Sequence, residues 1–102
     1  MKNKVIAIDL DGTLCSEEKT FEKALAKPLK GAVETLKNYS ASGHTIIIWT
    51  ARGWEQYRMT KHWLDQNEIP YDQIIMGKPI VDIFIDDRAY RFAGWENDYL
   101  GA

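Results

Sequence analysis

The chain has 102 residues, of which 45% are hydrophobic and 27% are charged, and its formal net charge is −2 at pH 7. This size predicts one folded domain over residues 1–102, and the balanced charge disfavours nucleic acids and membrane surfaces as partners. A single cysteine, Cys15, excludes an intramolecular disulfide and a Cys/His zinc site. The apolar stretch after Met1 is too short for a signal peptide or a membrane span, so a reducing cytoplasm is the expected location.

Short apolar runs alternate along the chain with stretches that have helical spacing. Continuous apolar runs are typical of strands in a parallel sheet, and their alternation with helices favours βαβ units with right-handed crossovers. The expected class is α/β, a Rossmann-like three-layer domain around a central parallel sheet. In chain order, the pattern predicts a strand at 5–8, a helix at 28–42, a strand at 45–49, a helix at 54–67, and strands at 74–76 and 81–85.

Two carboxylates, Asp9 and Asp11, directly follow the first predicted strand. Metal-assisted phosphoryl transfer needs such a pair, because Asp9 can act as nucleophile and metal ligand while Asp11 serves as general acid and then general base. Gly12 permits close approach of the backbone to a phosphate, and Thr13 can hydrogen-bond across the loop. A helix cap or a solvated loop is the alternative interpretation of the two acids.

Polar residues also follow the other predicted strands. Thr50 ends the second strand, Ala51 and Arg52 come next, and Lys78 precedes the last strand. Because ligands bind at the carboxyl ends of parallel strands, these residues are expected to meet Asp9 at one edge of the sheet. Thr50 and Ala51 would contact a phosphate, and Arg52 would bind a phosphate or a substrate carboxylate. Lys78 would neutralise charge on the nucleophile and the phosphoryl group. Helix capping by Thr50 and solvent-exposed positions for Arg52 and Lys78 are the alternatives.

The pair Asp86–Asp87 follows the last predicted strand. Adjacent carboxylates repel each other unless a cation or Arg88 compensates their charge. A hard divalent ion with oxygen ligands, most naturally Mg²⁺, would remove this repulsion where Asp9 and Asp86 meet. The sequence therefore predicts a magnesium site at the carboxyl ends of the first and last strands.

Taken in order, these motifs resemble those of the haloacid dehalogenase (HAD) superfamily of phosphotransferases, over nearly the whole chain. The stretch from Asp9 to Thr13 looks like the first motif of that superfamily, Thr50 the second, Lys78 the third and Asp86–Asp87 the fourth. The resemblance implies a Rossmann-like core, a Mg²⁺ cofactor and an aspartyl-phosphate intermediate on Asp9.

The same resemblance assigns the remaining roles at the predicted site. It implies that the backbone carbonyl of Asp11 and the side chain of Asp86 complete the metal ligands with Asp9. Asp87 would support these ligands without contacting the metal itself. Within the superfamily, an Asp two positions after the nucleophile marks phosphatases and phosphomutases. Asp11 therefore argues against a dehalogenase or a transport ATPase.

Many members of the superfamily insert a cap domain, for which this chain has little room. Residues 14–28 leave space for a short flap, and 51–77 are filled by one helix and one strand. The chain thus resembles capless members, which act on macromolecular phosphates or borrow a second subunit to close the site. The surroundings of Thr50 and Asp86 also look like small hydrolases associated with capsular or surface polysaccharide synthesis. Zinc-dependent capless heptose-bisphosphate phosphatases need a Cys/His cluster, which one cysteine excludes.

The sequence therefore predicts a Mg²⁺-dependent phosphomonoester phosphatase that acts through phospho-Asp9 on a small-molecule phosphate ester, most naturally a sugar phosphate. A polynucleotide or phosphoprotein phosphatase is the enzymatic alternative, since an open site permits it, although the chain has no basic stripe. A phosphate-binding or regulatory protein without turnover is the non-enzymatic alternative.

Overall fold

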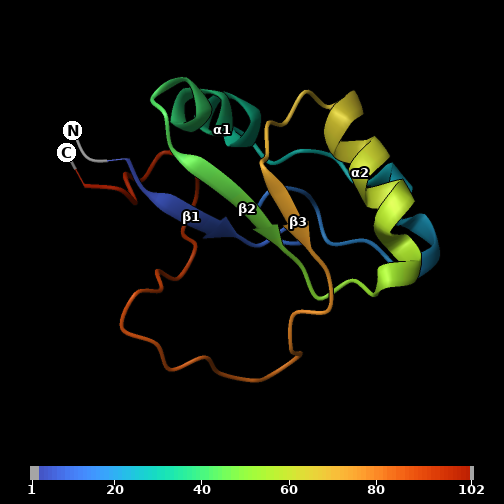
Figure 1. Ribbon diagram of the computed structural model, residues 1–102. Helices are drawn as coiled ribbons and strands as arrows, with labels where there is room; N and C mark the ends of the chain where they lie inside the picture. The colour runs from blue at the N-terminus through green and yellow to red at the C-terminus, as the bar shows by residue number, and fades with distance from the viewer. Residues whose placement is uncertain (1–2, 102) are drawn as a thin grey trace.

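A parallel sheet of three strands, in the order β1-β2-β3, organises the computed structural model, which describes residues 3–101 (Figure 1). Two short 3₁₀ helices and two α-helices connect the strands. The elements in chain order are β1 (Val5–Ile8), η1 (Thr20–Leu25), α1 (Ala32–Ala41), β2 (Thr45–Trp49), η2 (Trp54–Gln56), α2 (Tyr57–Gln66) and β3 (Gln73–Ile75).

The predicted α/β class and its parallel sheet are confirmed. The first two strands have the predicted bounds, and β3 begins and ends one residue earlier than expected. The first helix begins at Ala32 rather than at residue 28, because Gly31 has a left-handed backbone with φ of 82°. Before it, Pro28 pairs with Cys15 in an isolated β-bridge. A left-handed φ is strained for residues other than glycine, so the helix cannot extend backwards through Gly31.

One core cluster joins the strands to both α-helices, and α1 packs directly against β2. Alternate side chains of β2, those of Ile46 and Ile48, are fully buried, whereas Thr45 is exposed, as the two-residue period of a strand requires. Helix α1 adds Leu36 to this core, and helix α2 adds Leu64. Burial of such side chains stabilises the fold by about 1.5–3 kcal/mol each, so this cluster fixes the strand ends on which the site is built.

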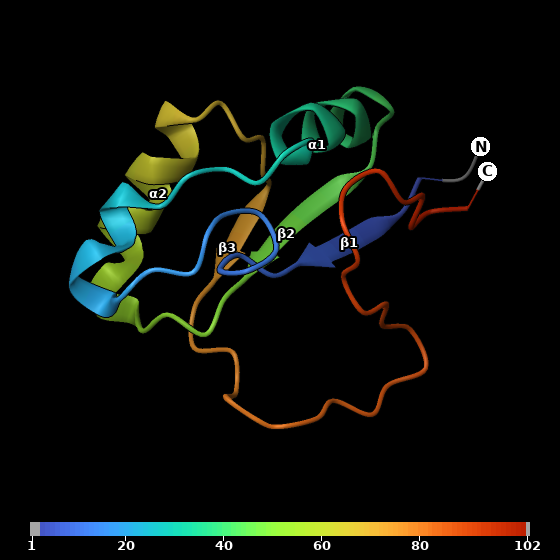
Figure 2. The same ribbon diagram turned by 180° about the vertical axis from the view of Figure 1, so that it is seen from behind.

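The predicted strand at 81–85 is wrong, because these residues form part of an irregular loop over 77–93. Lys78 makes the last backbone hydrogen bond to the sheet, and the next residue, Pro79, has no N–H to continue it. Figures 1 and 2 show this orange-to-red loop on the opposite side of the sheet from α1. Ile85 is 97% exposed there, and the outer edge of β1 pairs with no other strand among residues 3–101.

Within the described residues, none of the helices has the length and apolar character needed to cross a bilayer.

Candidate active site

The candidate site lies in the tight loop that follows β1. The carbonyl of Leu10 accepts backbone hydrogen bonds from Thr13 and Leu14, at 3.1 and 2.8 Å, and the side chains of Leu10 and Leu14 are fully buried. Gly12 takes a left-handed conformation with φ of 83° and donates its N–H to the carbonyl of Cys15. Two buried leucines thus anchor the loop, and they leave Asp9 and Asp11 to point away from the core.

Asp9 lies between a hydroxyl and an ammonium group. Its Oδ2 accepts a long hydrogen bond of 3.4 Å from the Thr13 hydroxyl, and its Oδ1 lies 3.7 Å from Nζ of Lys78. The side chain of Asp9 is 36% exposed. It is more exposed than Asp11 and than the three cations of the site, which are Lys23, Arg52 and Lys78. A carboxylate that is accessible and near a cation is available for attack on an incoming electrophile.

Lys78 is held at this edge by its backbone and by two aromatic rings. Its N–H donates to the carbonyl of Thr50 at 2.8 Å, and its Nζ lies 5.1 Å from the ring centroids of both Trp49 and Phe84. Aromatic faces attract an ammonium group, so the two rings help to fix its position beside Asp9. Phe84 comes from the loop over 77–93, which therefore contributes to the site through this side chain.

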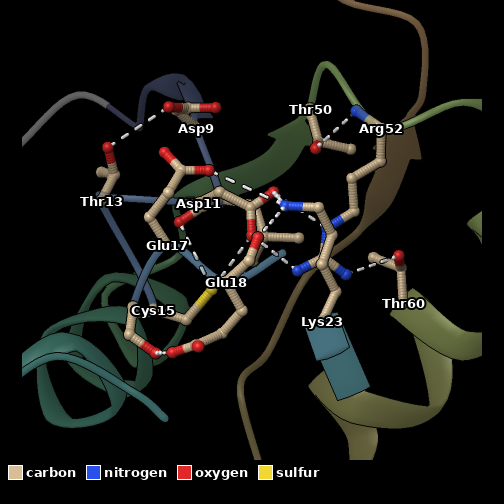
Figure 3. A network of polar contacts seen from close by, with 12 residues as sticks. Asp9, Asp11, Thr13, Cys15, Glu17, Glu18, Lys23, Thr50, Arg52 and Thr60 are labelled. Carbon is tan, nitrogen blue, oxygen red and sulfur yellow. Dashed lines mark hydrogen bonds and ion pairs between the residues drawn. The ribbon is translucent and has the colours of Figure 1, made fainter. Parts of the chain in front are cut away.

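Asp11 forms a two-pronged ion pair with Arg52, from the segment after β2 (Figure 3). Nη2 and Nε of Arg52 donate to Oδ1 and Oδ2 of Asp11 at 2.7 and 2.9 Å, and Nη1 donates to the hydroxyl of Thr60 on α2 at 2.9 Å. The guanidinium is almost completely buried. In this arrangement Arg52 orients a carboxylate of the protein itself, whereas the sequence predicted that it would bind a phosphate or a substrate carboxylate.

The surroundings of Asp11 act on its pKa in opposite directions. Burial alone would raise that pKa, but the hydrogen bonds and charge of Arg52, together with the charge of Lys23, outweigh burial and hold the pKa of Asp11 below its ordinary value of 3.8. Asp11 is therefore a carboxylate at neutral pH. Burial of Cys15 itself, together with the negative charge of Asp11, raises the pKa of the Cys15 thiol to about 12.

Thr50 is buried at the end of β2, and its hydroxyl accepts a 3.1 Å hydrogen bond from the backbone N–H of Arg52. The helix-cap alternative for Thr50 is wrong, because Gly53 and Gln56 occupy the N-caps of the helices that follow. A phosphate contact is compatible with this geometry, because a hydroxyl that accepts one bond can still donate its own hydrogen. The backbone N–H of Thr50 donates to the carbonyl of Ile75 and its carbonyl accepts from Lys78, so this strand end is fixed to β3 and the segment that follows it. The predicted contact residues Gly12 and Ala51 are exposed in the loops that follow β1 and β2.

Lys23 is a site residue that sequence reasoning did not identify. It comes from η1 in the flap, and its Nζ lies 3.5 Å from Oδ2 of Asp11 and 3.7 Å from Oε2 of Glu17 (Figure 3). It also donates to the carbonyl of Glu18 at 3.2 Å. The flap has several lysines and no apolar periodicity, so the sequence does not indicate which lysine faces the site. The path of the flap in the structure shows that it is Lys23.

The flap over 14–28 is fixed at both of its ends by tryptophan side chains. The indole N–H of Trp63 on α2 donates to the carbonyl of Ala26 at 2.8 Å, and that of Trp95 donates to the carbonyl of Thr13 at 2.7 Å. Between these points, η1 has no buried residue. The ends of the flap therefore belong to the folded domain, while its middle lies over the site.

Of the three predicted metal ligands, Asp9 and Asp11 lie in the loop after β1, and Asp86 lies elsewhere. Asp86 lies in the exposed loop over 77–93, where its carboxylate accepts a hydrogen bond from the N–H of Arg88. Across residues 3–101, no group of three or more His, Cys, Asp and Glu side chains is placed to hold a metal ion. The predicted convergence of Asp86 and Asp87 with Asp9 is thus not observed, because the stretch 81–85 that should carry them there does not join the sheet.

The remaining donors are nevertheless of the kind that magnesium prefers. Mg²⁺ binds through one or two carboxylates together with water and substrate phosphate, and it rarely uses a cage made entirely by protein. Asp9 supplies an accessible carboxylate oxygen, and it stands at the head of a loop whose Asp11 carbonyl is close by in sequence. The donor set therefore fits Mg²⁺, with an incomplete set of protein ligands.

Comparisons with known proteins agree with this fold. The family described as PITM 1-3, LNS2 domain, matches residues 6–92. The crystal structure of a target protein from Vibrio cholerae is 33% identical, with a TM-score of 0.74, and the match covers 86% of this chain and 83% of that one. No curated protein matches the chain.

Two further solved structures share the fold at lower identity. A chain in the structure of the Pnkp1/Rnl/Hen1 complex is 21% identical with a TM-score of 0.66, and the match covers 83% of this chain and 31% of that one. The D,D-heptose 1,7-bisphosphate phosphatase from B. bronchiseptica, solved with magnesium and phosphate, is 19% identical with a TM-score of 0.55. That match covers 78% of this chain and 52% of the phosphatase, so this chain spans only part of the length of either protein.

Proposed function

Since this chain belongs to the LNS2 domain family, which has the fold of HAD-like phosphatases, we propose that it hydrolyses phosphomonoesters through a phospho-enzyme on Asp9. The observation that carries the proposal is the environment of Asp9. Its accessible carboxylate stands at the end of β1 between the hydroxyl of Thr13 and the ammonium group of Lys78. A nucleophile flanked by donors that bind phosphoryl oxygens is the arrangement that phosphoryl transfer requires.

The reaction has two displacement steps. A carboxylate oxygen of Asp9 attacks phosphorus and forms an O–P bond as the bond from phosphorus to the ester oxygen breaks, and Asp11 in its protonated form gives its proton to the departing alcohol. Asp11 is then a carboxylate and removes a proton from water, which attacks phosphorus and releases inorganic phosphate from Asp9. Lys78 and Thr50 would hold the phosphoryl oxygens during both steps.

The contacts of Asp11 favour the second of these steps. Arg52 keeps Asp11 deprotonated and aligned, which suits a general base that activates water. The acid step needs Asp11 to carry a proton, which requires the pairing with Arg52 to loosen as the substrate arrives. We therefore assign Arg52 as a positioning residue for Asp11.

The magnesium ion belongs to this proposal. The carboxylate of Asp9, the backbone carbonyl of Asp11 and the side chain of Asp86 would hold it, with Asp87 behind Asp86, and when bound it would neutralise charge on the phosphoryl oxygens. Asp86 can join Asp9 only if the loop over 77–93 folds back toward the carboxyl end of β1. Asp86→Asn is then expected to raise the Mg²⁺ concentration needed for half-maximal activity by about tenfold.

The proposed substrate is a small phosphate ester, a sugar phosphate in particular, as in polysaccharide synthesis. The heptose bisphosphate phosphatase, which shares this fold, is named for a substrate of this kind. A polynucleotide or phosphoprotein is the second candidate, since none of the elements formed by residues 3–101 is a cap domain over the site and a chain of the Pnkp1/Rnl/Hen1 RNA repair complex has the same fold. A second copy of this chain could complete such an open site, which light scattering would detect as a dimer.

Hydrolysis of 4-nitrophenyl phosphate with and without Mg²⁺ tests the proposed function. We expect metal-dependent release of nitrophenol, lost in Asp9→Asn with unchanged circular dichroism and kept in the matched control Asp82→Asn, whose side chain lies in the exposed loop. Asp11→Asn should slow both half-reactions. If the wild type shows no metal-dependent hydrolysis, the protein is a phosphate-binding or regulatory protein instead. If Asp9→Asn retains the hydrolysis, Asp9 is not the nucleophile and the proposed mechanism is wrong. A panel of sugar phosphates, nucleotides, 5′- and 3′-phosphorylated oligonucleotides and phosphopeptides would then identify the substrate class.

A further inference from the structure

The side chain of Lys23 is largely shielded from solvent, although the short helix η1 that carries it has no buried residue. Its side chain is 11% exposed, whereas Phe21 and Leu25 of the same short helix are 82% and 73% exposed. A lysine loses side-chain entropy when it is held in one position, and lysines are seldom buried without a partner. Helix η1 therefore directs one cation inward, toward Asp11, and leaves Phe21 and Leu25 in solvent.

The charge of Asp11 is already compensated without Lys23. Arg52 binds both carboxylate oxygens at 2.9 Å or less, whereas Lys23 approaches one of them at 3.5 Å, beyond the range of a good hydrogen bond. The other carboxylate near Lys23, that of Glu17, is 3.7 Å away and lies on a mostly exposed side chain that is free to turn aside. Among residues 3–101, the carbonyl of Glu18 is the one group that accepts a hydrogen bond from this ammonium group, at 3.2 Å.

An ammonium group has three N–H donors, so Lys23 retains donor capacity at a point where positive charge is scarce. Of the other two cations, Arg52 is committed to Asp11 and Thr60, and Lys78 lies beside Asp9. An anion that entered next to Asp11 would therefore find Lys23 as its most available partner.

The position of Lys23 indicates which part of a substrate it would meet. In the proposed function, on which this inference rests, Asp11 gives its proton to the ester oxygen of the leaving group and must lie within hydrogen-bond reach of it. Nζ of Lys23, at 3.5 Å from Asp11, would then lie within roughly 7 Å of that oxygen. A negative group a few bonds beyond the ester oxygen comes within contact distance, while the transferred phosphoryl group lies on the other side, at Asp9.

We propose that Lys23 is a specificity-determining residue, which binds a carboxylate or second phosphate on the leaving group and so selects phosphate esters of anionic alcohols. The flap supplies this contact in place of a cap domain. Glu17 competes for Lys23 while the site is empty and turns aside when the substrate enters.

A matched pair of compounds tests the proposal. 3-Phosphoglycerate carries a carboxylate three bonds from its ester oxygen, and glycerol 3-phosphate has a neutral hydroxymethyl group in the same place. Binding is measured by calorimetry in an Asp9→Asn background, where no turnover is expected, so the result does not depend on hydrolysis. We expect 3-phosphoglycerate to bind about tenfold more tightly, as one charge-assisted hydrogen bond provides. This preference should disappear with Lys23→Met and persist with Lys27→Met, which removes a charge from an exposed position of the same flap.

Three results would overturn the inference: equal affinities in the Asp9→Asn background, a preference that survives Lys23→Met, or no binding of either compound. A purely structural lysine would lower the urea midpoint when replaced, but it would leave the ratio of the two affinities unchanged. Hydrolysis by the wild type is a separate question. Selective binding without hydrolysis would refute the proposed function and leave the role of Lys23 intact.

Discussion

Replacement of Arg52 by Met tests whether the pairing of Arg52 with Asp11 is a main stabilising contact between the loops that follow β1 and β2. The guanidinium is 1% exposed and the carboxylate 13%, so the substitution leaves a largely desolvated charge behind. Breaking a fully buried ion pair in this way costs about 3–5 kcal/mol. Because Asp11 keeps some solvent and retains Lys23 at 3.5 Å, we expect about 2–4 kcal/mol here. For a chain of this size, this loss lowers the melting temperature by roughly 10–25 °C.

The assay is urea unfolding followed by circular dichroism, with Arg58→Met as the control, since Arg58 is exposed on α2. A double-mutant cycle with Asp11→Asn isolates the pair from the loss of Arg52's contact with Thr60. We expect a coupling energy of about 2 kcal/mol. A coupling below about 0.5 kcal/mol, or equal destabilisation by the Arg58 and Arg52 substitutions, would refute the reasoning, because the pair would then behave like one on the surface.

Three further predictions follow from the same geometry. Because the pKa of Asp11 is lower in the native state than its ordinary value of 3.8, Asp11 stabilises the fold above pH 3.8, and this stability is lost as the pH falls through the native pKa. The urea midpoint should therefore drop more steeply between pH 5 and pH 2.5 in the wild type than in Asp11→Asn. Cys15 should resist a thiol reagent at pH 8 in the native state and react fully in urea, because its thiol is buried and its pKa is raised to about 12. Trp63→Phe removes the donor to Ala26 and should cost about 1–2 kcal/mol and speed proteolysis within the flap, and unchanged cleavage would show that this bond does not hold the flap.

Much of the sheet and part of the site could be predicted from the sequence. The apolar runs at 5–8 and 45–49 indicate strands because each is followed by polar residues, and parallel strands place such residues at one edge. That rule is sufficient to bring Asp9, Thr50 and Lys78 together. The stretch at 81–85 has the same apolar pattern, but a strand exists only when its backbone pairs with a neighbour, and composition cannot specify that pairing.

The ion-pair partners at the site could not be predicted for a different reason. An arginine after a strand can face a phosphate, a carboxylate or solvent. The residues around it in the sequence do not distinguish these three cases. Here the hydroxyl of Thr60, eight residues further along, turns the guanidinium of Arg52 toward Asp11. Lys23 likewise depends on the path of η1, which has no apolar periodicity to predict it.

The two indole hydrogen bonds at the ends of the flap have a consequence for how this protein can change over evolution. Since the bonds at Thr13 and Ala26 fix both ends, the fold does not depend on the length or sequence of the middle of the flap. Doubling the length of a flexible loop costs only about 0.6 kcal/mol, which is small beside the free energy of the core. Insertions between residues 17 and 25 are therefore a low-cost route to a new substrate, and related proteins should differ most in this segment while both tryptophans are retained.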